Sequence, residues 1–162
     1  MRTDAHIIMA VVTAFASVER PQHFGNYAHC EECQELEALL SAHDRDTLTV
    51  DQVDIPWLNP IAFSAIQGKA YYLPNLVRFA LEDSTASYWP RLIECLEGDG
   101  PNNALIAYCC EKQRLAIVGF LEHFIETRAT CIEAHDCTDQ VLRTHGHWAG
   151  VVSVAGDLWT HG

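Results

Sequence analysis

The strongest constraint on the fold is a long amphipathic segment at residues 104–127. Its apolar residues, such as Leu115, Val118 and Leu121, recur at intervals of three, and charged residues such as Glu122 fall between them. These intervals match the 3.6-residue period of an α-helix with one apolar face. The segment therefore predicts a central core helix around which the rest of the chain packs.

Shorter segments with helical periodicity lie on both sides, bounded by the prolines and glycines that begin or break helices. The predicted helices are residues 5–18, 29–43, 59–68, 70–83, 89–98 and 132–143. Residues 47–55 show no clear period and are predicted to be an extended connector. A chain of 162 residues can bury a sizeable core without disulfides. We therefore predict an all-α fold, a compact single-domain bundle of five to seven helices.

The end of the chain differs in composition, because it is rich in glycine, tryptophan and histidine. Gly146 is predicted to stop the last helix, and residues 155–157 (Ala-Gly-Asp) have the composition of a turn. We therefore expect a helical domain at residues 1–143. An irregular or hairpin-like segment at residues 144–162 would follow it and dock on it.

The composition is strongly acidic, with 22 acidic and 10 basic residues and a formal net charge of -12. Phosphates would be repelled, so we expect no binding to nucleic acid or to anionic membranes. No segment approaches the roughly 20 apolar residues of a membrane span, and the apolar run at residues 7–16 is short for a secretory signal. The seven cysteines are odd in number, and Cys109 and Cys110 are adjacent, which is a poor disulfide framework. These features predict a cytoplasmic protein in a reducing compartment.

Potential metal ligands and reactive thiols lie close together in one motif, His29-Cys30-Glu31-Glu32-Cys33, at the predicted start of the second helix. Zinc prefers thiolate and imidazole ligands and takes four of them in a closed structural site. Cys30 and Cys33, with His29, supply part of such a site. The missing ligands would come from a second cluster near the last helix, which consists of Cys131, His135 and Cys137. Two interpretations stay open: one structural zinc, or no cofactor and two cysteines that are merely packed.

A redox role for Cys30 and Cys33 is less favoured by the sequence. A reactive thiol pair needs positive neighbours or a helix N-terminus to stabilise the thiolate. Glu31, Glu32 and Glu35 surround the pair, and we expect them to raise the pKa of the thiols. The same carboxylates do not obstruct a cation, so the sequence favours metal binding over redox chemistry.

The sequence contains no HExxH zinc-protease motif, no GxSxG elbow and no phosphate-cradling glycine loop. Together with the acidity, this favours a non-enzymatic protein that binds a basic protein partner, such as an immunity protein that neutralises a bacterial toxin by covering a basic cleft. The candidate contacts are acidic residues in loops or at helix ends: Asp44, Asp46, Asp51, Asp54, Glu82 and Asp83. The alternative is a metal-dependent or small-molecule-handling enzyme centred on residues 29–33.

Several short motifs follow one another in the first half of the chain. They are TAFA at residues 13–16, RP at 20–21, HCEEC at 29–33, LNPIAF at 58–63 and YYLP at 71–74. In this order they resemble an uncharacterised family of small bacterial proteins, a domain of unknown function with an HCxEC motif and a YYLP motif. The resemblance covers roughly residues 7–83. It implies a compact cytosolic domain whose first helix is not a cleaved leader, and it implies no activity.

Overall fold

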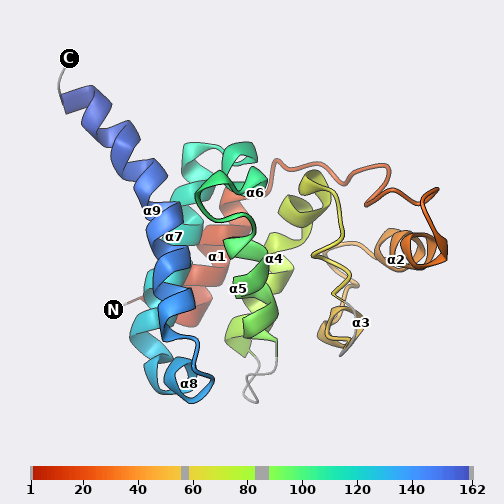
Figure 1. Ribbon diagram of the computed structural model, residues 1–162, viewed down its shortest axis with the longest axis horizontal. Coiled ribbons are helices and arrows are strands. Elements are labelled where there is room, and N and C mark those ends of the chain that lie inside the picture. The colour runs from red at the N-terminus through yellow and green to blue at the C-terminus, as the bar shows by residue number, and fades with distance from the viewer. Residues whose placement is uncertain (1, 56–58, 83–87, 161–162) are drawn as a thin grey trace. The chain divides into compact units, whose positions relative to one another are not determined.

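The computed structural model describes the backbone of residues 2–55, 59–82 and 88–160, and side chains as far as residue 150 (Figure 1). Over these ranges the chain forms nine α-helices, one short 3-10 helix and no strand. The all-α prediction is therefore confirmed, although the nine described α-helices exceed the five to seven that were predicted. None of the described helices is both long and apolar enough to cross a membrane.

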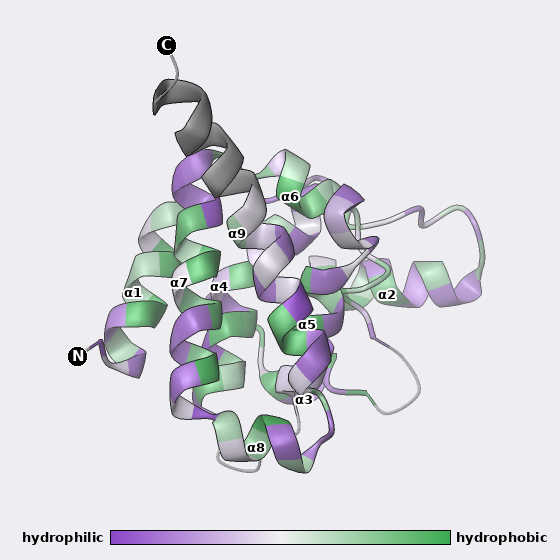
Figure 2. Ribbon diagram, turned by 60° about the vertical axis from the view of Figure 1, so that its left-hand side comes forward, coloured by the Kyte–Doolittle hydropathy of each residue, from purple (hydrophilic) through white to green (hydrophobic). Residues whose placement is uncertain are grey.

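The chain divides into two compact units, of which the first contains the N-terminal helix and the residues from 96 onward. Its elements are α1 (Asp4–Ala14), the 3-10 helix η1 (Gly100–Asn102), α6 (Ala104–Tyr108), α7 (Glu111–Thr127), α8 (Ala129–Ala134) and α9 (Thr138–Thr160). Helix α7 lies at the centre of this unit, because α1 and α9 both pack along it (Figure 1). Green and purple residues mix along α7 in Figure 2, and its buried side chains include Ile117, Leu121 and Phe124. The predicted core helix is thus present, as the centre of this unit.

The predicted helix at 104–127 is interrupted, however, and forms two helices, α6 and α7. The break falls at Cys109 and Cys110, which both have extended backbone. Cys110 acts as the N-cap of α7, and its backbone N–H donates to the side chain of Gln113 at 2.9 Å. This capping box starts a new helix. The backbone hydrogen bonds of α6 therefore end before α7 begins, although apolar residues continue along both helices.

The irregular or hairpin-like ending predicted for residues 144–162 is wrong, because α9 continues as a helix to Thr160. The chain breaks earlier instead, between α8 and α9, where Asp136 has a φ of 53°. Gly146 does not stop α9, and a Cβ at this position would meet nothing within 4 Å. Trp148 anchors the helix, since its side chain is fully buried and its indole N–H donates to the carbonyl of Leu96 at 2.8 Å. α9 also spans the expected domain boundary at residues 143 and 144.

The second unit comprises residues 15–95 and is built around α4. Its helices are α2 (Glu31–Ser41), α3 (Val50–Val53), α4 (Ile66–Glu82) and α5 (Trp89–Glu97), of which the last two residues fall in the first unit. The predicted break at Gly68 is wrong, because α4 passes through Gly68 and also holds Pro74 in its interior. An interior proline costs roughly 3 kcal/mol. Burying a large apolar side chain contributes about 2 kcal/mol, and α4 buries many of them, including Leu73 and Leu76.

The extended connector predicted at residues 47–55 contains the short helix α3. Thr49 caps it, and its backbone N–H donates to the side chain of Gln52 at 2.8 Å. Val53 is fully buried on the inner side of this turn. The sequence features that mark α3 are this capping box and one buried valine. The segment is too short to show a helical period.

Candidate metal centre

Helix α2 begins in the middle of the cysteine motif, so its first turn brings the two thiols together. Cys30 is the N-cap, with extended backbone at φ -162° and ψ 173°, and its sulfur accepts the backbone N–H of Cys33 at 3.4 Å. A side-chain acceptor at this position satisfies one of the free N–H groups at the helix start. The two sulfur atoms consequently lie 3.2 Å apart.

His29 completes the cluster from the residue before the cap. Its Nδ1 lies 3.7 Å from the sulfur of Cys33. One atom from each of His29, Cys30 and Cys33 lies within 4.8 Å of the others, and among the described residues this is the one such group of three or more potential metal ligands. The motif residues singled out in the sequence therefore do converge in space.

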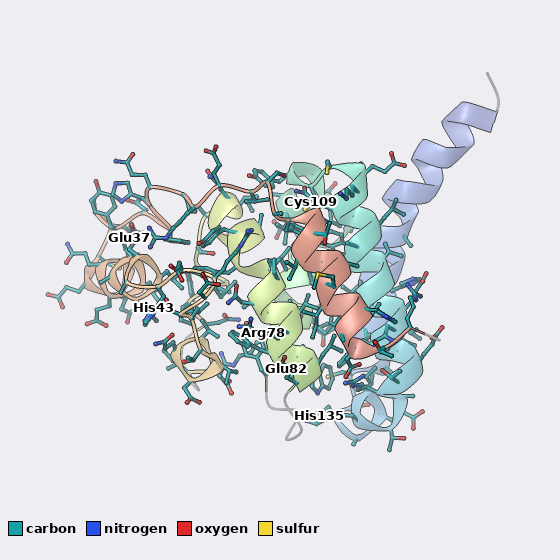
Figure 3. The ribbon with its side chains drawn as sticks, turned by 180° about the vertical axis from the view of Figure 1, so that it is seen from behind. Glu37, His43, Arg78, Glu82, Cys109 and His135 are labelled. Atoms are coloured by element: carbon teal, nitrogen blue, oxygen red, sulfur yellow. The ribbon has the colours of Figure 1, made fainter. Side chains whose placement is uncertain are left out.

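Glu37 holds the loop that leads into the motif, although it is not itself part of the motif. Its carboxylate accepts the backbone N–H of Phe24 at 2.6 Å and of Gly25 at 3.0 Å, and it pairs with the imidazole of His23 at 3.0 Å. Figure 3 shows Glu37 on α2 beside this loop. Partial burial opposes ionisation, but these hydrogen bonds and that of Ser41 outweigh it and lower the pKa of Glu37. The carboxylate is therefore ionised at neutral pH and fastens the loop to α2.

Phe24 anchors the same loop on α4. Its buried ring stacks on Tyr72 with ring centroids 5.2 Å apart, and its carbonyl accepts the backbone N–H of Ala65 at 2.5 Å. The ring lies so close to α4 that a Cβ at Gly68 would fall 2.8 Å from it. A few residues later the N–H of His29 donates to the carbonyl of Asn26 at 3.1 Å. The imidazole of His29 thus extends from a loop that is fixed at both ends.

The two thiols have opposite pKa shifts. Hydrogen bonds from the backbone and side chain of Cys33, with a smaller contribution from His29, lower the pKa of Cys30 to about 7. The pKa of Cys33 is raised, mainly because it hydrogen bonds to Cys30. The expectation that the glutamates raise both pKa values is therefore wrong for Cys30. Glu31, Glu32 and Glu35 are exposed, where solvent screens their charge, whereas the N–H of Cys33 contacts the sulfur directly.

A cavity of about 410 Å³ opens beside the cluster. Its walls are largely apolar and include Phe24, Leu36, Leu40, Pro60 and Phe63. His29, Cys30 and Cys33 line the same cavity, together with the carboxylate-bearing Glu32. A small molecule in this cavity would therefore contact the three potential ligands directly.

The second predicted group of ligands lies in the other unit of the chain. The imidazole Nδ1 of His135 is 2.9 Å from the carbonyl oxygen of Cys131 and 3.9 Å from its sulfur. The sulfur of Cys137 donates to the carbonyl of His135 at 3.2 Å. These three residues do not belong to the cluster at residues 29–33. Their part in a shared zinc site stays a prediction.

The acidic residues predicted to contact a partner differ in how available their charges are. Asp46 and Asp51 are exposed. Asp54 pairs with Arg91 at 2.9 Å, and Glu82 lies 3.9 Å from Arg78 on α4 (Figure 3). The remaining candidates are occupied or not described: Asp44 accepts the N–H groups of Asp46 and Thr47, which lowers its pKa, and Asp83 lies outside the described residues.

The residue that sequence reasoning missed is Glu37. It follows Cys33 by four positions, so both side chains lie on one face of α2, and that face also carries the buried Leu36 and Leu40. A carboxylate beside two buried leucines is unusual unless it is paired. This was the available signal, but it does not identify the backbone N–H groups of the loop as the partners.

No protein-family model, curated protein or solved structure matches this chain. The resemblance to an uncharacterised bacterial family therefore stays a prediction.

Proposed function

We propose that residues 29–33 bind a thiophilic divalent cation such as Zn²⁺, through Nδ1 of His29 and the sulfurs of Cys30 and Cys33. Given Zn–S and Zn–N distances of about 2.3 and 2.0 Å, ligand atoms around a tetrahedral ion lie about 3.5–3.8 Å apart. The Sγ–Sγ distance is 3.2 Å and the distance from Sγ of Cys33 to Nδ1 of His29 is 3.7 Å. Small side-chain rotations are therefore enough to admit the ion.

The function that this site supports best is the metal-dependent handling of a small molecule. Three protein ligands leave a fourth position open, as in catalytic rather than structural zinc sites. The single observation that carries the proposal is that all three ligands line the 410 Å³ apolar cavity. A bound ion would act there as a Lewis acid toward a polar atom of a largely apolar molecule. The proposal places the protein in the cytoplasm, where both thiols stay reduced.

The test is a calorimetric titration of the metal-free protein with ZnCl₂ in the presence of a non-thiol reductant. We expect one ion per chain, and at least a tenfold loss of affinity in each of His29→Ala, Cys30→Ser and Cys33→Ser. Cys110→Ser is the matched control, because Cys110 is also an exposed thiol at a helix N-cap but lies outside the cluster. Equal binding by all four variants would refute the proposal.

A second candidate function is the binding of a basic protein partner, such as a bacterial toxin neutralised by this protein as its immunity protein. It is supported by the net charge of -12 and by the exposed carboxylates of Asp46 and Asp51. Asp54 contributes less to such a surface, because its charge is balanced by Arg91.

The test of the second candidate is a low-salt pull-down with wild type and with Asp46→Asn combined with Asp51→Asn. A basic protein should be recovered by the wild type, less of it by the double variant, and less again as salt rises. Recovery that is unchanged in the double variant and at high salt would argue against this candidate.

A further inference from the structure

We propose that Cys30 and Cys33 form a reversible disulfide by exchange with a small disulfide that carries apolar substituents. This activity uses the sulfurs of the proposed metal site but requires the metal-free dithiol. It is therefore a second chemistry of the same residues. It does not depend on whether the site also binds zinc.

The first observation is the distance between the sulfurs, 3.2 Å. A disulfide bond is about 2.05 Å long, so closing it requires a movement of about one ångström. Both thiols lie in the first turn of α2, with Cys30 on extended backbone at the cap. Cys109 and Cys110 are neighbours in sequence, but one is buried and the other exposed.

The second observation is that the two cysteines differ in access. Cys30 is exposed and Cys33 is half-buried. The backbone N–H of Cys33 donates to the sulfur of Cys30, and the positive end of the helix dipole favours negative charge at the same place. Cys30 is therefore the sulfur that attacks, and Cys33 is the sulfur that resolves.

The chemistry balances in two exchange steps. The thiolate of Cys30 attacks one sulfur of a disulfide RS–SR, which forms a mixed disulfide and releases one RS⁻. The thiolate of Cys33 then attacks the sulfur of Cys30 and releases the second RS⁻. The protein loses two protons and two electrons, and the small disulfide is reduced to two thiols.

The third observation indicates the class of disulfide. The cavity beside Cys30 is walled by apolar side chains such as Leu36, Leu40 and Phe63. Glu32 and the half-buried Glu37 line the same cavity, so an anionic substituent bound there would be repelled. The preferred substrate is therefore an uncharged disulfide with apolar or aromatic substituents.

The experiment uses the full-length, fully reduced protein in chelator, with 4,4′-dithiodipyridine as a neutral aromatic disulfide. Peptide mapping by mass spectrometry then shows the state of each cysteine. We expect Cys30 and Cys33 to be joined by a disulfide without a retained adduct. Cys110 should instead keep a pyridylthio adduct, because the neighbouring Cys109 is buried. This makes Cys110 an internal control for an exposed thiol that has no resolving partner.

Two variants assign the roles of the sulfurs. Cys33→Ser should trap the pyridylthio adduct on Cys30, and Cys30→Ser should leave Cys33 to react at least tenfold more slowly. Both changes lie at an exposed helix start, and far-UV circular dichroism verifies that the fold is kept. An adduct that persists on Cys30 in the wild type, or no reaction there, would overturn the proposal.

The charge preference is tested with the dianionic aromatic disulfide 5,5′-dithiobis(2-nitrobenzoate). Relative to Cys110, Cys30 should prefer the neutral reagent by several-fold at low salt, and the preference should shrink as salt rises. A preference of Cys30 for the dianion would refute the assigned substrate class. Because zinc binding is measured under reduction and exchange is measured in chelator, the failure of one proposal leaves the other testable.

Discussion

Replacing Glu37 with glutamine should release the loop that carries His29 while it leaves both cysteines in place. The carboxylate accepts two backbone N–H groups, from Phe24 and Gly25, and pairs with His23. Its side chain is only 12% exposed, so water cannot readily replace these contacts. A glutamine keeps the size of the side chain but removes the charge.

The size of the effect follows from those bonds. A hydrogen bond to a charged group contributes roughly 1.5–3 kcal/mol and a neutral one roughly 0.5–1.5 kcal/mol, so each loses about 1 kcal/mol when the charge is removed. With two backbone donors, we expect Glu37→Gln to lower the free energy of unfolding by about 2 kcal/mol. The wild-type pKa of Glu37 is lowered in the folded protein. The stabilisation of the fold by the Glu37 carboxylate is therefore complete above the ordinary glutamate pKa. It is lost as pH falls through the pKa of Glu37 in the folded protein.

The assay is urea denaturation followed by circular dichroism, together with amide hydrogen exchange at Phe24 and Gly25. Glu35→Gln is the matched control, because Glu35 is exposed on the same helix and its replacement should change stability by less than about 0.5 kcal/mol. Exchange at both amides should accelerate in Glu37→Gln alone, and zinc affinity should fall with it. If the two variants have equal stability and equal exchange, the carboxylate does not hold the loop.

Two further changes test other contacts. Asp4 accepts a bidentate pair from Arg128, which holds its pKa at about 2 against partial burial. Since the Asp4 side chain is 42% exposed, Asp4→Asn should cost about 1 kcal/mol at pH 7, and the cost should vanish as the pH of a denaturation series falls from about 4 to 2. Gly68→Ala should destabilise by about 1 kcal/mol in thermal unfolding, because its Cβ would lie 2.8 Å from the Phe24 ring. Gly146→Ala should instead stabilise by up to about 1 kcal/mol, since it gains helix propensity in open space; the same sign for both glycines would contradict this reasoning.

Hydrophobic periodicity predicted the helical class and the central role of α7. An apolar stripe such as that of Ile117, Leu121 and Phe124 must be buried against other helices in a chain of this size. The predicted limits of some helices agree with the structure, such as residues 89–98 for α5 (Trp89–Glu97), whereas the predicted starts of α4 and α7 do not. Gly68 was predicted to end a helix, yet it lies inside α4, as does Pro74, because the burial of α4 outweighs the local cost of both residues. Cys110 carried no breaking signal, yet it caps a new helix. The extent of α4 thus depended on tertiary burial, which a local pattern does not contain, whereas the start of α7 depended on a local capping box.

The candidate metal centre likewise has features that the sequence predicted and features that it did not. The spacing of Cys30 and Cys33 at the start of a predicted helix was enough to place both sulfurs together, because one helical turn fixes that geometry. The loop contacts of Glu37 and Phe24 join residues more than ten positions apart, so no local pattern reveals them. The predicted direction of the Cys30 pKa shift was wrong for a related reason. Counting nearby glutamates ignores the one N–H that contacts the sulfur.

The two proposals for the cluster constrain each other, because a metal ion and a disulfide use the same electron pairs on Cys30 and Cys33. A cation that binds the dithiol and not the disulfide must stabilise the reduced form by mass action. For a two-electron couple, a free metal concentration 100-fold above the Kd lowers the reduction potential by about 60 mV. Zinc should therefore slow oxidation of the wild type by 4,4′-dithiodipyridine, and His29→Ala should lose this protection while it still forms the disulfide. Protection that persists in His29→Ala would show that the imidazole is not a ligand, even if both sulfurs are.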